Sequence, residues 1–288
     1  MKTRIISATV MISIVIAVLV TGYLYSFWII TGLLLLLSVA ATFEILHYIV
    51  KTGNVFRKAA ACLYAAAAFF SVSDILHGAY DVCMSQTEVD VSKISSSLSY
   101  LLLATMIYIL LFTLSLITEK KDFDIKEILA LLGAPFMYSA AFATLDCIIT
   151  RHDGIYYLLL VINFSSICDT GAYFTGVTLG RHKLCEHVSP KKTVEGAVGG
   201  IVLSLAVTAA ILFGFRTEAN MLAMLGITVL MCGIGMLGDL FASAVKRSVG
   251  EKDFSNLIPG HGGILDRFDS MLFISPAMLA LMLLGVIR

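Results

Sequence analysis

The sequence predicts an all-α, polytopic integral membrane protein, and two observations lead to this fold class. The first is composition, because 59% of the 288 residues are hydrophobic and only 14% are charged. Soluble domains carry about 25% charged residues, so this composition argues against a water-soluble globule. The second is the grouping of apolar residues into long runs, since a helix that crosses the hydrocarbon core needs roughly 20 of them. We therefore expect about nine membrane helices.

The expected spans follow one another through short connections. The first comes directly after Met1–Arg4 and could be taken for a secretory signal. No clean small-residue cleavage site follows it and the second span begins almost at once, so we expect a membrane helix. We divide the chain into an amino-terminal region, 1–125, and a second region, 126–288, that contains the most polar loops. In chain order, the expected spans are 4–22, 25–43, 59–78, 95–118, 126–148, 154–178, 194–214, 219–245 and 266–287.

Lys and Arg residues gather in alternate connections, and this asymmetry predicts the orientation of the chain. Short loops that face the cytoplasm carry the excess of basic residues. We therefore expect a cytoplasmic amino terminus, with the polar loops 179–193 and 246–265 both on the cytoplasmic side. Since 20 Lys and Arg balance 20 Asp and Glu, the net charge gives no reason to expect nucleic-acid binding. The basic-rich connections contain Lys2 and Arg4; Lys51, Arg57 and Lys58; Lys120, Lys121 and Lys126; Arg181, Lys183, Lys191 and Lys192; and Lys246, Arg247, Lys252 and Arg267.

The carboxylates first singled out within or near the ends of the expected spans are Glu44, Asp74, Asp146, Asp169 and Asp239. Ionisable residues inside a membrane are costly and are functional candidates by default. Glu44 and Asp146 lie close to span ends, so we expect an interfacial or snorkelling role for them. Asp74, with His77 one turn later, is expected on the side that is poor in basic residues.

The carboxylate Asp169 begins a patterned stretch. On a helix Asp169, Tyr173 and Gly176 share one face, which places a carboxylate and a phenol beside a glycine. An alternative is small-residue helix packing, with Gly176 and Gly180 forming a seam. Packing explains the glycines but leaves the aspartate unexplained.

The next polar loop contains paired lysines before a helix. Lys191, Lys192 and Thr193 would place two ammonium groups and a hydroxyl beside exposed helix amides, which is typical of a phosphate site. The same lysines are also what the basic bias of cytoplasmic loops predicts. This loop alone leaves both interpretations open.

The last polar loop favours a site. Asp239, Ser243 and Lys246 recur at helical spacing and share one face at the end of a span. The stretch 259–263 then contains Gly262 and Gly263, and glycines free backbone N–H groups to turn toward an anion.

Carboxylates on either side of this loop suit a hard cation. Asp239, Asp266 and Asp269 offer oxygen ligands of the kind that Mg²⁺ prefers when it bridges phosphate oxygens. A solvated loop with self-neutralising charges is the alternative, but it does not require this concentration of Gly, His, Lys, Arg and Asp between membrane helices. The residues therefore predict a metal- and phosphate-binding site at the cytoplasmic bilayer surface.

The stretch Ser243–Asp269 resembles the signature of the phosphatidate cytidylyltransferases, and every fixed position of that pattern is filled. Upstream, Asp169–Gly176, Gly180–Lys183 and Ser189–Gly196 are similar to a second conserved region of the same family. Val194 departs from this pattern, because the family usually has Trp there. The amino-terminal half matches in hydropathy only.

This resemblance implies that CTP and phosphatidate react to give CDP-diacylglycerol and pyrophosphate, in a fold of about nine membrane helices that is often a homodimer. It implies a requirement for Mg²⁺, with room for a second cation, and makes 126–288 the catalytic region. His261 is given a hydrogen-bonding or structural role, because a phosphate monoester is already largely ionised at neutral pH. The implied roles are Asp239 and Asp266 as metal ligands, with Asp269 a weaker candidate; Lys246, Arg247, Lys252 and Arg267 as phosphate ligands; Lys191, Lys192 and Thr193 for the triphosphate; and Asp169, Tyr173, Ser243, His261, Gly262 and Gly263 as further substrate-binding residues.

Two other functions share part of this pattern. A CTP-dependent polyprenol or phytol kinase would use similar groups but would release CDP. A secondary transporter would also contain many spans and intramembrane carboxylates, but transporters are built from internal repeats with sites near the midplane. Here no repeat is visible and the polar residues gather at one membrane face.

Overall fold

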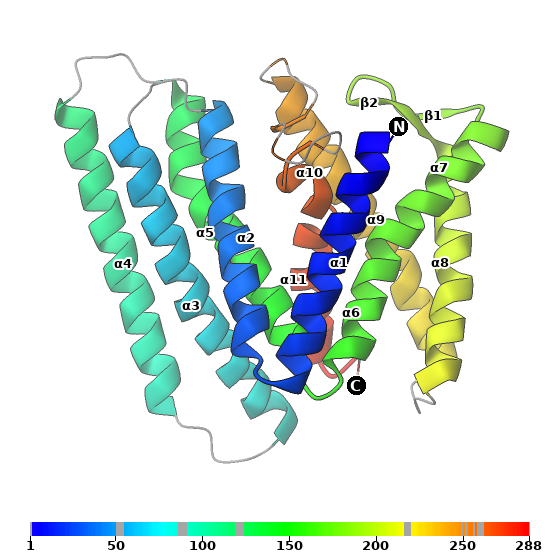
Figure 1. Cartoon of the computed structure of the whole chain (residues 1–288), viewed down its shortest axis with the longest axis horizontal. Coiled ribbons are helices and arrows are strands. Elements are labelled where there is room, and N and C mark those ends of the chain that lie inside the picture. The colour runs from blue at the N-terminus through cyan, green and yellow to red at the C-terminus, as the bar shows by residue number, and fades with distance from the viewer. Residues whose placement is uncertain are drawn as a thin grey trace. The chain divides into compact units, whose positions relative to one another are not determined.

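Figure 1 shows the computed structural model of the chain, which is helical apart from one two-stranded hairpin within the part described. Residue contacts divide the chain into two compact units, and each is described by itself. The first unit comprises Met1–Thr150 and Asp253–Arg267, and the second comprises Arg151–Lys252 and Phe268–Arg288. The structure describes residues 2–49, 55–85, 91–118, 124–215, 220–248, 250, 253–255, 257 and 262–287.

The predicted fold class is confirmed. Among the described residues, 7 helical segments are long and apolar enough to cross a membrane, and two shorter apolar helices cover Ser13–Leu24 and Met271–Leu283. These segments do not establish the expected number of nine membrane spans. The long segments are Trp28–Ile49, Val55–Cys83, Ser92–Ile117, Glu127–Ile149, Gly154–Leu179, Val194–Phe215 and Met221–Ser248.

The last expected span, 266–287, is interrupted. It consists of the short helix α10 (Leu265–Phe268), a turn, and α11 (Met271–Leu283). In the turn, the Asp269 side chain accepts the Ser270 N–H at 2.7 Å. A short polar side chain that bonds a neighbouring amide competes with the helical hydrogen-bond pattern. The continuous helix that hydropathy predicted therefore breaks at Asp269.

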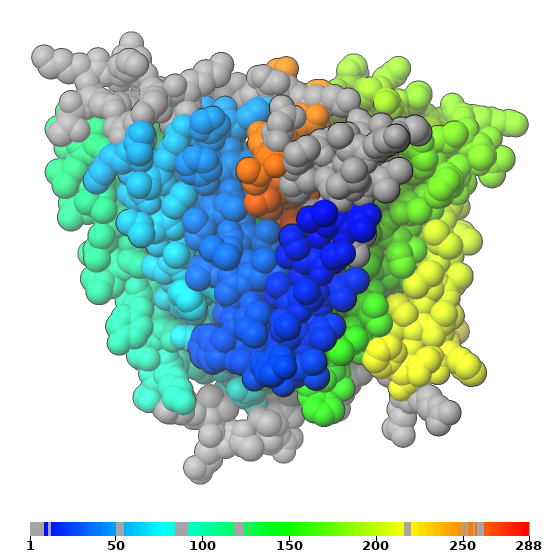
Figure 2. All heavy atoms as spheres, viewed as in Figure 1, coloured from blue at the N-terminus to red at the C-terminus, as the bar shows by residue number. Residues whose placement is uncertain are grey.

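The first unit is a helical bundle with a carboxyl-proximal segment added to it. In the bundle α3 packs against both α4 and α5, while α2 packs against α3 and α5. In Figure 2 α1 lies on the surface, in dark blue. Its apolar side chains Val10, Ile14 and Ile16 are all more than half exposed, as expected of a helix that faces lipid. The helices are α1 (Lys2–Leu24), α2 (Trp28–Ile49), α3 (Val55–Ser85), α4 (Val91–Thr118) and α5 (Ile125–Ile149).

A buried carboxylate links three of these helices. Asp146 on α5 is 1% exposed. It accepts hydrogen bonds from Thr31 Oγ1 at 2.8 Å and from Ser73 Oγ at 2.7 Å. The donors lie on α2 and α3, so the side chain does not snorkel to an interface as predicted. Its role is to cross-link the bundle through polar groups that are satisfied internally.

The second unit begins with one long helix that changes its winding. It consists of α6 (Gly154–Ile162), the π-helical turn η1 (Asn163–Ile167) and α7 (Cys168–Leu179). In η1 the buried Asn163 donates through Nδ2 to Ser204 O at 3.0 Å and to Thr208 Oγ1 at 2.9 Å. Both acceptors lie on α8 (Val194–Phe215), so Asn163 ties the two helices together. Helix α9 (Met221–Ser248) packs against α8 and α11.

Glycines allow α7 and the start of α8 to approach closely. A Cβ added to Gly176 would lie 3.0 Å from Thr193 Oγ1, and one on Gly180 would lie 2.8 Å from Thr193 Cγ2. The packing seam considered for Gly176 and Gly180 is therefore present. It accounts for these glycines without assigning them chemistry.

Adding a methyl group at Gly200 is expected to destabilise the fold. A Cβ there would lie 2.5 Å from Cys168 O and 3.1 Å from Ala172 Cβ. Since backbone atoms cannot yield cheaply, we expect Gly200→Ala to cost about 1–3 kcal/mol of stability. The matched control is Gly214→Ala on the same helix, where an added Cβ meets nothing within 4 Å. Thermal unfolding in detergent checks this prediction, and equal melting temperatures for the two variants would contradict it.

A β-hairpin interrupts the helices in the predicted polar loop 179–193. Strand β1 (Lys183–Cys185) pairs antiparallel with β2 (Ser189–Thr193), with Lys183 opposite Thr193 and Cys185 opposite Ser189. The sequence analysis did not predict these strands, because they are too short for an alternating hydrophobic pattern to register. The hairpin ends where α8 begins and so fixes the position of the paired lysines.

Candidate active site

The centre of the candidate site is an ion pair within the second unit. Lys192 Nζ on β2 contacts Asp239 Oδ2 on α9, and the two side chains are 25% and 22% exposed. Sequence analysis assigned both residues to the site but did not predict that they pair. Breaking a largely buried ion pair of this kind costs stability, because removing one partner leaves the other charge uncompensated.

Two further carboxylates surround this ion pair. Asp169 on α7 lies within electrostatic reach of both Lys192 and Asp239. Asp269 lies in the turn before α11, within electrostatic reach of the like charge of Asp239 and of the opposite charge of Lys246. Carboxylates that repel one another in this way are stabilised when a cation lies among them.

A glycine on α9 brings this helix close to the turn that carries Asp269. A Cβ on Gly238 would lie 2.9 Å from Asp269 O and 2.9 Å from Phe273 Cδ2. The absence of a side chain at Gly238 therefore lets the next residue, Asp239, approach Asp269. We call the group of Asp169, Lys192, Asp239, Lys246 and Asp269 the charged cluster.

The helix face predicted on α9 is only partly turned inward. Ser243 Oγ lies 3.4 Å from Asp239 Oδ1, which is a long hydrogen bond. Lys246 is 9% exposed, whereas Arg247 is exposed. Helical spacing therefore predicted correctly that Asp239 and Ser243 are neighbours. The buried Lys246 ammonium lies within electrostatic reach of Asp269, as expected because buried charges are paired in folded proteins.

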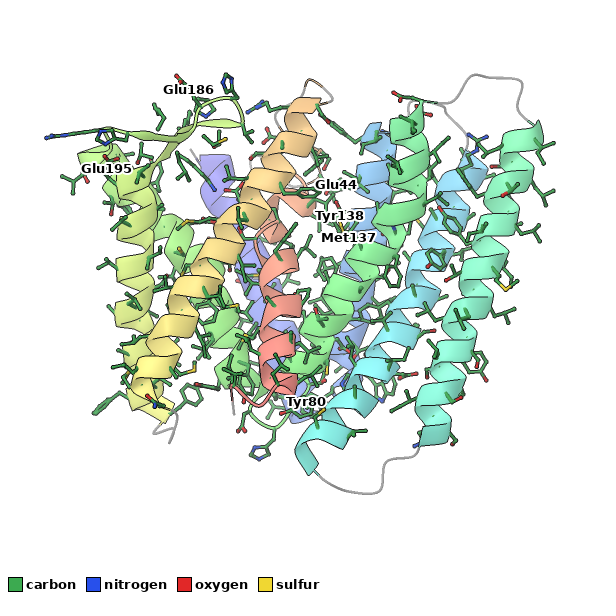
Figure 3. All side chains as sticks on the ribbon, turned by 180° about the vertical axis from the view of Figure 1, so that it is seen from behind. Glu44, Tyr80, Met137, Tyr138, Glu186 and Glu195 are labelled. Carbon is green, nitrogen blue, oxygen red and sulfur yellow. The ribbon has the colours of Figure 1, made fainter. Side chains whose placement is uncertain are left out.

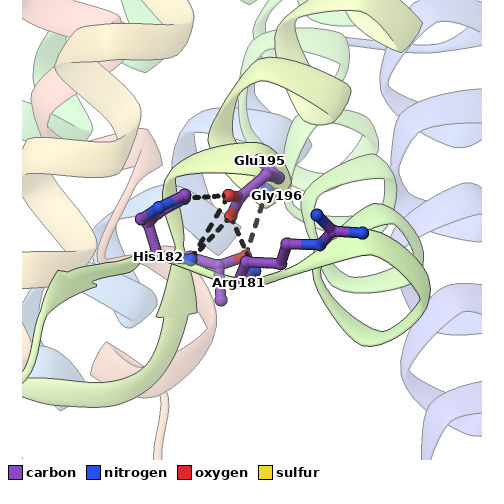
Figure 4. A network of polar contacts seen from close by, with 5 residues as sticks. Arg181, His182, Glu195 and Gly196 are labelled. Atoms are coloured by element: carbon purple, nitrogen blue, oxygen red, sulfur yellow. Dashed lines mark hydrogen bonds and ion pairs between the residues drawn. The ribbon is translucent and has the colours of Figure 1, made fainter.

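The hairpin is held at its base by a glutamate (Figure 4). Glu195, in the first turn of α8, accepts the backbone N–H of Arg181 at 3.0 Å and that of His182 at 3.1 Å. Its other oxygen lies 2.5 Å from His182 Nδ1. These bonds fasten the end of α7 to the start of α8. The hairpin and Lys192 are thereby fixed between two helices.

Thr193 serves the backbone in this structure. Its Oγ1 accepts the Gly196 N–H at 3.1 Å, and the residue is 8% exposed. This is the N-cap arrangement, which satisfies a free amide of the helix. The triphosphate role suggested for Thr193 stays a prediction.

Two other predicted site residues lie apart from the charged cluster in their described contacts. Tyr173 is 66% exposed, and its ring meets that of Phe174 edge-on at 5.6 Å. Lys191 is exposed on β2. Their substrate-binding roles stay predictions. Lys252 and His261 lie outside the described residues.

In the first unit, Asp266 organises the segment around the predicted glycines. Its Oδ2 accepts the N–H of Phe254 and the N–H of Gly263, each at 2.9 Å. Gly262 has a φ of 83°, a backbone conformation that favours glycine. Arg267 follows and is exposed. Asp266 thus has a structural role that the sequence analysis missed, in addition to its predicted metal role.

A buried carboxylate on α2 contacts this segment. Glu44 on α2 is 6% exposed and accepts the Leu265 N–H at 2.8 Å. A second hydrogen bond comes from Ser255 Oγ. The carboxylate is therefore turned into the protein and does not snorkel as predicted. The available signal was that Glu44 is the only charged residue in an otherwise apolar run, the usual mark of a functional intramembrane residue.

The residues present fit a magnesium ion of the type that the family resemblance implies. Within the described ranges, no three His, Cys, Asp or Glu side chains form a ready-made metal site. Mg²⁺ usually binds one or two carboxylates and completes its shell with water and substrate phosphates. Asp239 and Asp269 in the charged cluster satisfy this requirement, and Asp266 remains a predicted ligand in its own unit.

Long apolar helices with a cluster of carboxylates and ammonium groups define a multi-pass membrane protein equipped for phosphate chemistry. The sequence matches the cytidylyltransferase family over residues 2–284, and the chain belongs to this family. The match includes the amino-terminal helices, for which sequence analysis found similarity in hydropathy only.

Three of the relatives that carry the name phosphatidate cytidylyltransferase illustrate the similarity. One from Staphylococcus haemolyticus is 43% identical over 147 residues, 51% of this chain and 54% of the relative. One from Staphylococcus aureus (strain COL) is 45% identical over 127 residues, 44% of this chain and 49% of the relative. One from Staphylococcus saprophyticus is 41% identical over 148 residues, 51% of this chain and 54% of the relative. The chain thus spans about half the length of the curated relatives it matches.

Proposed function

We propose that the protein is a phosphatidate cytidylyltransferase, which converts CTP and phosphatidate into CDP-diacylglycerol and pyrophosphate. The observation that carries this proposal is the charged cluster, in which Lys192 pairs with Asp239 close to two further aspartates. The family match and the names of the relatives support it. Neither the lipid kinase nor the transporter is favoured by a finding of this kind.

The reaction requires little covalent chemistry from the protein. An oxygen of the phosphatidate phosphate forms a bond to the α-phosphorus of CTP. The bond between that phosphorus and the oxygen that bridges to the β-phosphate breaks, and pyrophosphate leaves with the electron pair. Because both reactants carry negative charge, catalysis consists of positioning and charge neutralisation.

The charged cluster can supply both contributions. Lys192 and Lys246 would bind phosphate oxygens, with Asp239 holding Lys192 in position until substrate arrives. Asp239 and Asp269 would hold Mg²⁺, together with any second cation, and Asp266 stays a predicted metal ligand within its own unit. When bound, Mg²⁺ neutralises charge on the phosphates that react and leave. Arg247 and Arg267, both exposed in the structure, would extend the basic surface toward water-soluble CTP.

We place this site at the cytoplasmic face. The basic bias of alternate connections supports that orientation, with the amino terminus on the same side. Phosphatidate would keep its acyl chains in the leaflet while its headgroup meets CTP at the interface. A homodimer stays a prediction that cross-linking in native membranes can check.

An assay of the purified full chain tests the proposed function. The protein is incubated in mixed micelles with phosphatidate, CTP and Mg²⁺, and both products are measured. We expect CDP-diacylglycerol and pyrophosphate in equal amounts. Release of CDP with transfer of a phosphoryl group to a lipid alcohol would identify a lipid kinase instead. Solute flux into sealed vesicles without nucleotide, and no CDP-lipid, would favour a transporter.

A further inference from the structure

Glu44 is a buried carboxylate whose described hydrogen-bond donors both come from the far end of the chain. The Leu265 N–H, 221 residues away, donates to Oε2 at 2.8 Å. Ser255 Oγ, 211 residues away, donates to Oε1. All three residues belong to the first unit. Burying a carboxyl group to 6% exposure is costly unless hydrogen bonds compensate it, and both described bonds come from this segment.

The surroundings of Glu44 leave it little freedom. Tyr138 on α5 lies near it (Figure 3) and is 7% exposed. The next residues on α2, Ile45 and Leu46, are buried at 3% and 0%. The carboxylate is therefore held between apolar helices and the described residues Ser255, Gly263 and Leu265.

Gly263 is fitted against this carboxylate. A Cβ added at Gly263 would lie 2.5 Å from Glu44 Cδ and 2.7 Å from Oε2. Gly263 is not one of the described glycines with positive φ, so its backbone conformation is open to alanine. The nearest atoms that a side chain there would meet all belong to the Glu44 carboxyl group, because both groups would occupy the same place.

Asp266 completes the arrangement from the other side. It accepts the N–H groups of Phe254 and Gly263, while Glu44 accepts from the adjoining residues Ser255 and Leu265. The two carboxylates together therefore fix both described ends of the segment 254–265. Displacing either one shifts the backbone that carries the other's partners.

We infer that Glu44 is a positioning residue, which sets the placement of Asp266 and Gly263 by holding Ser255 and Leu265. The inference rests on the proposed function, in which Asp266 is a metal ligand and Gly263 lies in the phosphate-binding loop. In this proposal Glu44 acts through the residues it holds and not by contact with substrate or metal. It acts as outer hydrogen-bonding partners of metal sites do, whose loss typically costs about 10- to 100-fold in activity or metal affinity.

The first test compares Glu44→Gln with Asp146→Asn. Both variants replace a buried carboxyl group of the first unit that accepts two described hydrogen bonds, but the donors to Asp146 lie on α2 and α3. We expect Glu44→Gln to lower kcat/KM by about 10- to 100-fold and to raise the Mg²⁺ concentration required for half-maximal rate. Asp146→Asn, measured per folded molecule, should change neither quantity. Equal behaviour of the two variants would overturn the inference.

The second test uses the steric conflict between Gly263 and Glu44. Gly263→Ala should lower both the melting temperature and kcat/KM, because its Cβ displaces the carboxylate. Glu44→Asp withdraws the carboxylate by one methylene group, so the double variant Glu44→Asp/Gly263→Ala should recover part of both losses. If the two losses simply add, Glu44 does not act through Gly263 and the inference fails.

The two tests separate failure of this inference from failure of the proposed function. A wild-type protein that forms no CDP-diacylglycerol would refute the function. Recovery of the melting temperature in the double variant would still support the role of Glu44 in positioning Gly263. Wild-type turnover together with an unaffected Glu44→Gln variant would refute the inference alone.

Discussion

Replacing Asp239 with asparagine is expected to reduce CDP-diacylglycerol formation by roughly 10²- to 10³-fold, the loss typical when a preorganised charge is removed from a reaction centre. Asparagine keeps the size of the side chain and an oxygen for Ser243. It removes the charge that pairs with Lys192 and repels Asp269. Initial rates in mixed micelles measure the effect.

The matched control for Asp239→Asn is Asp153→Asn. Asp153 belongs to the same unit, and its side chain is 70% exposed. This control should retain the wild-type rate. If Asp239→Asn stays within the scatter of Asp153→Asn, the charged cluster is not the reaction centre. Combining Asp239→Asn with Lys192→Met should cost less than the sum of the single losses, because groups that act as a unit are not additive.

The second large effect is expected at Asp266, where two substitutions separate structure from charge. Asp266→Ala removes the acceptor for the Phe254 and Gly263 amides. Each buried amide left unsatisfied costs about 1–3 kcal/mol, so we expect lost stability together with lost activity. Asp266→Asn keeps an acceptor oxygen but not the negative charge. We expect it to melt close to the wild type while losing activity by about 10²-fold.

Measuring the rate against Mg²⁺ concentration decides the role of Asp266. A metal ligand predicts that Asp266→Asn needs more Mg²⁺ to reach half its maximal rate. If the asparagine variant is fully active while the alanine variant is not, Asp266 only organises the backbone. Its predicted metal role would then be wrong.

Local patterns predicted well whatever depends on residues close together in sequence. The length of apolar runs predicted membrane helices such as Val194–Phe215, expected at 194–214. Helical spacing predicted that Asp239 and Ser243 are neighbours, and their side chains lie 3.4 Å apart. These inferences succeed because hydropathy and helical periodicity act over one or a few turns.

Other parts of the site lay beyond such patterns. The sequence analysis did not predict that the Thr193 hydroxyl caps α8, and its triphosphate role stays a prediction. It did not predict that Tyr173 is mostly exposed and packs on Phe174, and its substrate-binding role also stays a prediction. Helical spacing says which residues share a face but not which face packs inward, since that depends on the neighbouring helices.

The sequence by itself determined that this chain is a multi-pass membrane protein. It also determined which polar residues are candidates for the site, because charged residues are rare in apolar helices. Only the tertiary structure decided which of them meet. It paired Lys192 with Asp239, and it brought Glu44 to Leu265 across 221 residues. The physical reason is that contacts between distant segments depend on how whole helices pack, and no local spacing specifies that packing.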